Sequence, residues 1–181
     1  MDDLEISSAE ALWAWLSEHH ASLVSVRLVT WKAHHPTKYV SRDAVLDALL
    51  AHGWIDGRRF RVDEDRTAQL ISRRKQQAWA KTYKERVEKL RAAGLMHPAG
   101  EAAIAQAKAL GLWDFYDDVD ALVVPSDLGR RLHLESWETL PKSYRRNVLR
   151  WLKHAKTEAT RAKRIGQICE ATEAGRRLAQ M

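Results

Sequence analysis

The segment from Gly53 to Lys81 constrains the fold of this chain more than any other part of the sequence. It contains two strand-like runs, Trp54–Val62 and Thr67–Arg73, and the residues between them are Asp-Glu-Asp-Arg. Aspartate favours turns because its short side chain bonds to the backbone of the residues that follow. The segment is therefore predicted to form a β-hairpin, and part of the fold must be a sheet.

The pairing of the two predicted strands follows from where the loop closes. A loop centred on Glu64 and Asp65 places Asp56 opposite Arg73, so that a carboxylate meets a guanidinium across the ladder. Side chains alternate along a strand, so Trp54 lies on the same side as Asp56. The hairpin is expected to carry an ion pair beside an indole ring.

Most of the remaining sequence has the spacing of amphipathic helices. A capping box at residues 7–10, with Ser7 as the cap, predicts the first helix, and Ser41 predicts the second. A further strand is predicted at residues 23–31, and further helices are predicted from Gln76 to Ala93, from Pro98 to about Leu110, after Pro125, after Pro141 and after Thr157-Glu158. These elements predict an α+β fold that is mostly helical, with a small three-stranded antiparallel sheet and a C-terminal helical pair.

The expected domain organisation is a core with a helical appendage. Residues 1–124 are predicted to form the α+β core that contains the hairpin. Residues 125–181 are predicted to form a basic helical subdomain, packed on the core in a single compact unit. A chain of 181 residues is long enough to bury a core without disulfides.

The charge is distributed in alternating blocks. Residues 1–57 and 92–141 are acidic, whereas residues 58–91 and 142–164 are basic, and the net charge is +6. We favour pairing between these blocks, because nucleic-acid-binding domains usually show an unopposed basic excess. Nucleic-acid binding through residues 142–164 is kept as an alternative, with this basic surface: Arg145, Arg146, Arg150, Lys153, Lys156, Arg161 and Arg164.

The residues that usually carry catalysis or bind metals form no complete pattern. Cys169 is the single cysteine and lies on an apolar helix stripe, so it is predicted to be a buried thiol in a reducing, cytoplasmic compartment. His19-His20 and His34-His35 are adjacent pairs, whose side chains point apart on a regular helix or strand. No metal, cofactor or catalytic residue is therefore predicted. No apolar run approaches the length of a membrane span, which excludes insertion.

A candidate ligand pocket is predicted on the hairpin and its surroundings. A carboxylate among aromatic rings and guanidinium groups fits a small anionic ligand or a protein partner. The predicted lining residues are Trp31, Trp54, Asp56, Arg73, Arg74, Trp79 and Lys81. The alternative is that the Asp56–Arg73 pair fixes the hairpin and the tryptophans fill the core.

The chain resembles the YdeI/OmpD-associated, or bacteriocin-protection, family of small bacterial proteins over nearly its whole length. The resemblance is carried by GWIDG at 53–57, Arg73-Arg74 followed by Trp79 and Lys81, GLMHPAG at 94–100, Ala107-Lys108 with Gly111 and Trp113, VPSDL at 124–128, Trp151 with Ala155-Lys156, and Thr160-Arg161 with Arg164-Ile165. The family pattern PRR-x-x-S-x-W-S-x-x-N differs here at Ser72, Gln77, Ala80 and Tyr83. The resemblance implies resistance to bacteriocins or antimicrobial peptides and no established reaction.

The sequence predicts a binding module for a small ligand or a protein partner, linked to antimicrobial-peptide or stress resistance. The first alternative is a nucleic-acid-associated protein that uses residues 142–164. The second is an enzyme acting on a small anionic substrate at Asp56 and Arg73, with Asp56 as the base. The two substituted serines and the substituted asparagine favour binding over catalysis.

Overall fold

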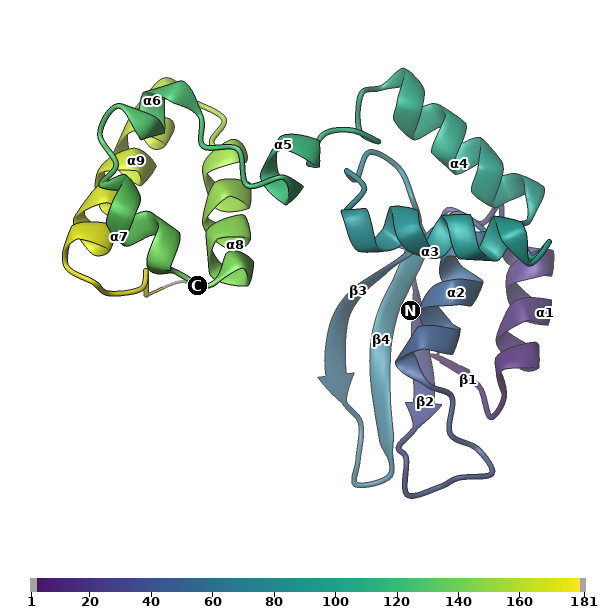
Figure 1. The fold of residues 1–181 in the computed structure, drawn as a ribbon. Helices are drawn as coiled ribbons and strands as arrows, with labels where there is room; N and C mark the ends of the chain where they lie inside the picture. The colour runs from purple at the N-terminus through teal and green to yellow at the C-terminus, as the bar shows by residue number, and fades with distance from the viewer. Residues whose placement is uncertain (1–2, 180–181) are drawn as a thin grey trace. The chain divides into compact units, whose positions relative to one another are not determined.

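The computed structural model describes residues 3–179, and the chain divides into two compact units, Met1–Asp114 and Phe115–Met181 (Figure 1). This division falls earlier in the chain than the predicted boundary after residue 124. The sheet and the predicted hairpin belong to the first unit, and the second unit is helical.

The first unit contains a mixed sheet of four strands in the order β1-β2-β4-β3. The strands are β1 (Asp3–Glu5), β2 (Val26–Trp31), β3 (Trp54–Arg61) and β4 (Arg66–Arg73). β1 runs parallel to β2, and the other two pairs are antiparallel. The predicted three-stranded antiparallel sheet was therefore wrong. β1 has three residues in an acidic segment, too few to show an alternating pattern.

The hairpin forms, but its predicted register was wrong. Trp54 pairs with Arg73, and Asp56 pairs with Ile71 rather than with Arg73. The register then shifts between Asp56 and Arg59, where a β-bulge adds a residue to β3. The loop is also longer than a two-residue turn, because Arg61 and Thr67 are its last paired residues.

Two helices pack on one face of the sheet, α1 (Ala9–His19) and α2 (Arg42–Ala51). Ser8, rather than the predicted Ser7, caps α1, and Ser41 caps α2 by accepting a bond from the amide of Ala44. The core between helices and sheet consists of these residues: Ile6, Leu12, Leu16, Val26, Leu28, Val40, Val45, Ala48, Leu49, Trp54 and Ile71. The inward-facing side chains of the strands and of the two helices thus form one apolar layer.

A second pair of helices in this unit, α3 (Lys81–Ala92) and α4 (Pro98–Ala109), packs against the C-terminal end of α2. Pro98 opens α4, as predicted from its place in the sequence. Gly100 of α4 lies directly against the backbone of α2, since a Cβ atom there would lie 2.1 Å from the carbonyl oxygen of Ala51. The contact therefore requires glycine.

The second unit contains α5 (Asp117–Asp120), α6 (Ser126–Gly129), α7 (Leu134–Thr139), α8 (Lys142–Lys153) and α9 (Glu158–Glu173). Its own core includes Leu128, Trp137, Val148, Leu152 and Ile168. The predicted C-terminal pair corresponds to α8 and α9, onto which three shorter helices pack. Within residues 3–179, no helix has both the length and the apolarity to cross a membrane.

Candidate functional site

Three of the predicted pocket residues, Asp56, Arg74 and Trp79, come together around Tyr83. The Tyr83 hydroxyl donates a bond of 2.7 Å to Oδ1 of Asp56. The guanidinium carbon of Arg74 lies 3.9 Å from the centre of the Trp79 ring and 5.3 Å from that of Tyr83. Trp54 is completely buried nearby and donates from its indole nitrogen to the carbonyl of His20.

The other predicted residues lie apart from this cluster. Arg73 is exposed at the end of β4, opposite Trp54, and lines an open groove with Arg74 and Lys75. Lys81 is exposed at the start of α3 and lies 3.8 Å from Glu85. Trp31 lies at the far end of β2. The ion pair and the wall of tryptophans expected from the sequence are therefore not assembled as one pocket.

The cluster around Tyr83 is closed. Burial lowers the pKa of Arg74 to about 10, and its Nε and Nη2 atoms have no hydrogen-bond partner within residues 3–179. Burial, reinforced by the Asp56 carboxylate, raises the pKa of Tyr83 to about 12, so the phenol keeps its proton and donates it. The cavity beside Asp56, Arg74 and Tyr83 has no room even for a water molecule. Its size fits a structural polar cluster better than a ligand site.

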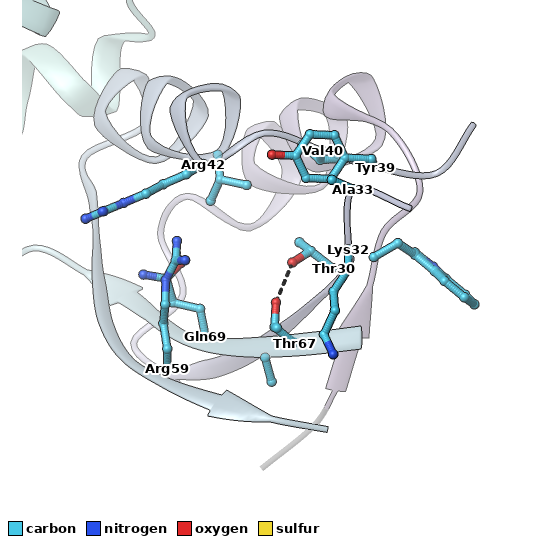
Figure 2. Close-up of a pocket in the computed structure, with 12 residues that line it drawn as sticks. Thr30, Lys32, Ala33, Tyr39, Val40, Arg42, Arg59, Thr67 and Gln69 are labelled. Carbon is cyan, nitrogen blue, oxygen red and sulfur yellow. Dashed lines mark hydrogen bonds between the residues drawn. The ribbon is translucent and has the colours of Figure 1, made fainter. Parts of the chain in front are cut away.

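A larger pocket opens on the helix-covered face of the hairpin, between the sheet and the start of α2 (Figure 2). Its volume is about 260 Å³. The lining residues are Thr30, Trp31, Lys32, Ala33, Tyr39, Val40, Arg42, Val45, Arg59, Thr67, Ala68 and Gln69. Trp31 is the one residue of the predicted set among them.

The pocket has a neutral polar floor and a cationic end. The hydroxyls of Thr30 and Thr67 lie 3.3 Å apart on neighbouring strands. Figure 2 shows the guanidinium groups of Arg42 and Arg59 at the same end of the pocket. Among the described residues, no carboxylate forms an ion pair with either of them. The pocket therefore presents two guanidinium groups with open donors to an incoming group.

The β-bulge explains why Arg59 faces this pocket. Asp56 pairs with Ile71, whose side chain belongs to the helix-covered core. In a regular strand, the side chain three residues further would point to the opposite face. The bulge adds one residue, so Arg59 pairs with Gln69 and shares its face.

Asp56 is connected to the pocket through Gln69. The Gln69 side chain donates from Nε2 to Oδ2 of Asp56 at 3.0 Å, and its Oε1 accepts from Nη2 of Arg59 at 3.4 Å. Both carboxylate oxygens of Asp56 thus accept hydrogen bonds, one from Gln69 and one from Tyr83. Asp56 positions its neighbours, and a role as a general base has no support in this geometry.

Sequence reasoning missed the residues that build the cationic end. Arg59 depends on the bulge, and the only local signal for it is Gly57, since glycine in a strand often marks an irregularity. Arg42 follows the helix cap Ser41, and α2 begins there. Gln69 lies in the middle of a strand and carries no signal of its own.

A second group that sequence reasoning set aside consists of His34, His35 and Asp65. The Nε2 atoms of His34 and His35 lie 3.0 Å and 2.8 Å from the same Oδ1 of Asp65. The hydrogen bonds from His35 and His34 lower the pKa of Asp65 to about 2. The two imidazoles converge because they lie in a turn, where the alternation of a strand does not apply.

The predicted basic surface of the second unit is largely paired with aspartates of the same unit. The pairs are Arg146 with Asp120 (3.3 Å), Arg150 with Asp120 (3.9 Å), Lys153 with Asp118 (2.6 Å) and Arg161 with Asp127 (2.5 Å). Arg164 donates to the carbonyl of Trp151, Arg145 is half-buried, and Lys156 is exposed. Four of the seven predicted basic residues are therefore paired with carboxylates of their own unit, which favours internal pairing over phosphate contacts.

Comparison with known families gives two matches, one in each unit. Residues 4–103 match a domain of unknown function, DUF8412, and residues 121–175 match the family described as bacteriocin-protection, YdeI or OmpD-associated. The resemblance expected over nearly the whole chain is thus confirmed for residues 121–175. The GWIDG hairpin and the Arg73-Arg74 to Trp79 segment lie in the DUF8412 match.

Neither the search of curated proteins nor the search of solved structures found a match. The DUF8412 match covers more than half of the 181 residues, and the second match adds a segment of a different family. The chain belongs to the family defined by the DUF8412 domain, and its residues 121–175 match the bacteriocin-protection, YdeI or OmpD-associated family.

Proposed function

We propose that this protein is a binding module for a small anionic ligand, which it takes up in the pocket on the helix-covered face of the hairpin (Figure 2). The observation that supports this proposal most strongly is that Arg42 and Arg59 lie at one end of the pocket and that, among the described residues, no carboxylate forms an ion pair with either. Guanidinium groups bind carboxylates and phosphates through paired hydrogen bonds, and an anion would satisfy both side chains at once.

The remaining lining residues favour a compact ligand with further polar groups. The volume of about 260 Å³ lies just below the range of pockets for drug-sized molecules. The hydroxyls of Thr30 and Thr67 can donate to or accept from a hydroxyl or carbonyl of the ligand. Val40 and Val45 add apolar side chains to the lining. A small carboxylic acid or phosphate ester with one or two additional polar groups fits this lining.

The experiment is a calorimetric titration of the full chain with a panel of small dicarboxylates, hydroxy acids and phosphate monoesters. The test variant is Arg42→Gln/Arg59→Gln, which removes both charges from the pocket. Arg58→Gln is the matched control, since Arg58 is the exposed neighbour of Arg59 on the same strand. We expect the double variant to bind at least about tenfold more weakly, because each charge-assisted bond contributes about 1.5–3 kcal/mol.

Two outcomes contradict the proposal. One is that no member of the panel binds the unmodified chain. The other is that Arg58→Gln weakens binding as much as the double variant does. Far-ultraviolet circular dichroism and a urea titration of each variant establish that a loss of binding is not a loss of folding.

We further propose that ligand binding serves protection against bacteriocins or related antimicrobial peptides. The support is the family description of the segment at residues 121–175. A strain without the gene should become more sensitive to such peptides, and the unmodified gene should restore resistance. Complementation by the Arg42→Gln/Arg59→Gln gene should fail. If the deletion strain is as resistant as its parent, the physiological role is refuted and the binding activity is not.

A further inference from the structure

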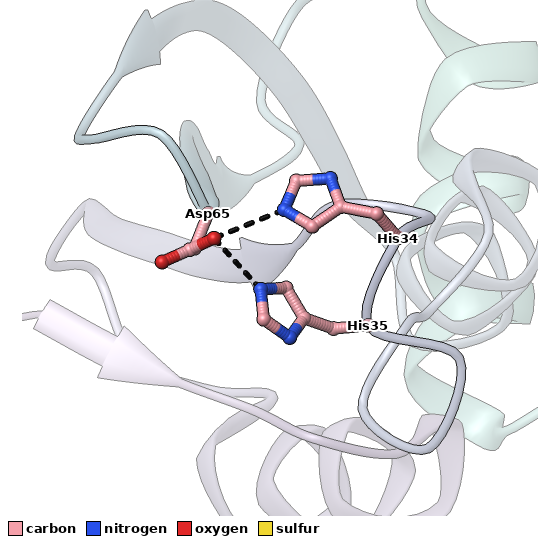
Figure 3. A group of neighbouring side chains, drawn as sticks. All are labelled: His34, His35 and Asp65. Atoms are coloured by element: carbon pink, nitrogen blue, oxygen red, sulfur yellow. Dashed lines mark hydrogen bonds and ion pairs between the residues drawn. The ribbon is translucent and has the colours of Figure 1, made fainter.

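We infer that His34, His35 and Asp65 form a binding site for a divalent transition-metal ion, with Zn²⁺ as the preferred ion (Figure 3). The three residues offer two imidazole nitrogens and one carboxylate oxygen, and these atoms all lie within 4.8 Å of one another. Figure 3 shows both imidazole rings directed at the Asp65 carboxylate. The site is separate from the cationic end of the ligand pocket and does not depend on the proposed function.

The spacing of the ligand atoms is close to that of a tetrahedral zinc site. Bonds of 2.0–2.2 Å place neighbouring corners of a tetrahedron about 3.4 Å apart. The two distances from imidazole Nε2 to Asp65 Oδ1 are 3.0 Å and 2.8 Å. The two histidine–aspartate distances therefore need to lengthen by only about 0.5 Å to admit an ion.

The kind of ligand selects the kind of ion. Imidazole nitrogen suits zinc, copper, nickel and iron, whereas calcium and magnesium prefer oxygen ligands alone. Three protein ligands leave a fourth position of the tetrahedron for water or for a group of a bound molecule. Two imidazoles with one carboxylate thus favour zinc over the alkaline-earth ions.

Lys32 links the two loops that carry the ligands through three hydrogen bonds. The backbone amide of Lys32 donates to the carbonyl of Asp65 at 2.8 Å. The Lys32 side chain donates to the carbonyls of Asp63 and Glu64, at 3.0 Å and 2.6 Å. Asp63 in turn accepts from the amide of Asp65 at 2.9 Å, which fixes the hairpin turn.

The histidine loop has its own backbone bonds. The amide of His35 donates to the carbonyl of Lys32 at 3.0 Å, and the amide of Tyr39 donates to the carbonyl of His35 at 2.9 Å. The rings of Trp31 and His35 pack in a T-shaped arrangement, with the centroids 5.0 Å apart. Ligands held in place before binding lose little conformational freedom when the ion arrives, which favours affinity.

An ion can reach the site from solvent. The exposed fractions of the side chains are 56% for His34, 34% for His35 and 51% for Asp65. A bound ion would join the loop between β2 and α2 to the hairpin turn between β3 and β4. Lys32 and Tyr39, in the same loop, line the ligand pocket, so the ion would restrain one wall of that pocket.

The contrasting interpretation is a metal-free clamp, in which the imidazoles only donate hydrogen bonds to Asp65. Calorimetric titration with Zn²⁺ distinguishes the metal site from the metal-free clamp. The sample is the full chain, without an affinity tag and treated with a chelator beforehand. We expect one ion per chain, and at least about tenfold weaker binding in His34→Ala/His35→Ala and in Asp65→Asn.

Two matched controls test whether the loss is specific. His19→Ala/His154→Ala removes two exposed imidazoles from other places, and Glu64→Gln removes the neighbouring carboxylate of the same turn. Both should bind Zn²⁺ as the unmodified chain does. If His34→Ala/His35→Ala binds Zn²⁺ as tightly as the unmodified chain, or if a control loses as much affinity as the test variants, the assignment is overturned.

A measurement on the unmodified chain keeps the inference testable if the variants fold poorly. Co²⁺ can replace Zn²⁺, and a tetrahedral nitrogen and oxygen site gives strong visible absorption that added Zn²⁺ removes. We expect this absorption at one equivalent of Co²⁺. If there is no absorption and no heat of Zn²⁺ binding up to about 1 mM, the three residues are a structural clamp and the inference is wrong.

Discussion

The phenol of Tyr83 donates a hydrogen bond of 2.7 Å to Oδ1 of Asp56, and this bond joins α3 to β3. The other oxygen of Asp56 accepts from Gln69, which also contacts Arg59 in the ligand pocket. Asp56 therefore links the helix, both strands of the hairpin and the cationic end of the pocket.

Replacing Tyr83 by phenylalanine removes the donor and leaves an oxygen of Asp56 without its partner. Hydrogen bonds to charged groups contribute about 1.5–3 kcal/mol, so we expect the free energy of unfolding to fall by about 2 kcal/mol. Urea titration followed by circular dichroism measures this change. Tyr39→Phe is the matched control, because Tyr39 is 45% exposed and the change should cost less than about 0.5 kcal/mol. Equal losses in the two variants would contradict the assigned role of the bond.

Local patterns predicted the parts of the fold that depend on neighbouring residues. Ser41 and Pro98 mark helix starts because a cap and a fixed φ act within one turn. The hairpin was also predictable, since its turn and its strands are close in sequence. β1 was not predictable, because it pairs with β2, which lies more than twenty residues further along the chain. Its three residues are also too few to show a strand pattern of their own.

The candidate sites were less predictable for the same reason. Arg59 reaches the pocket only because of a bulge, and a shift of one residue exchanges the two faces of a strand. The grouping of His34 and His35 on Asp65 depends on a turn meeting a hairpin loop. Asp56 was among the predicted site residues, but the sequence did not predict its partners, because Tyr83 and Gln69 come from other elements of the fold.

Acidification should destabilise the first unit through His52. Burial lowers the pKa of this imidazole, and the nearby His97 and His20 lower it further, although its bond to the carbonyl of Ala48 acts in the opposite direction. The unfolded chain, with a pKa near 6.5, then binds more protons than the folded chain. The contribution of His52 to stability is present above about pH 6.5 and is lost as the pH falls toward the lowered pKa.

Urea titrations at about pH 7.5 and about pH 5.5 test this prediction. The stability difference between the two pH values should be smaller in His52→Gln than in the unmodified chain. His19→Gln is the control, because His19 is exposed on α1 and its removal should leave the pH dependence unchanged. An unchanged pH dependence in His52→Gln would assign the acid sensitivity to other groups.

The same substitution should have opposite effects at two glycines. In Gly100→Ala, the new Cβ would lie 2.1 Å from the carbonyl oxygen of Ala51, and the backbone of α2 or α4 must move. We expect a loss of about 3 kcal/mol or more, the upper part of the range for overpacking. In Gly166→Ala, the Cβ would meet no described atom within 4 Å beyond the adjacent residues and the nearby backbone of α9, and the helix propensity of alanine should add about 0.5–1 kcal/mol. Equal effects in thermal unfolding would contradict the close approach at Gly100.

Replacing Arg74 by methionine should change stability little, although the side chain is only 5% exposed and carries a charge. Burial lowers its pKa from 12.5 to about 10, which corresponds to a cost of about 3 kcal/mol for keeping the charge in the folded state at neutral pH. Its contact with the Trp79 ring returns about 2 kcal/mol where water is excluded. The two effects nearly cancel.

Methionine keeps much of the packing against Trp79 and removes the two nitrogen atoms that lack a partner. We therefore expect the free energy of unfolding of Arg74→Met to lie within about 1 kcal/mol of that of the unmodified chain. Arg73→Met, at the exposed neighbouring position, is the matched control and should be neutral. A loss of more than about 3 kcal/mol in Arg74→Met alone would mean that the buried guanidinium stabilises the fold through its charge, which its missing partners argue against.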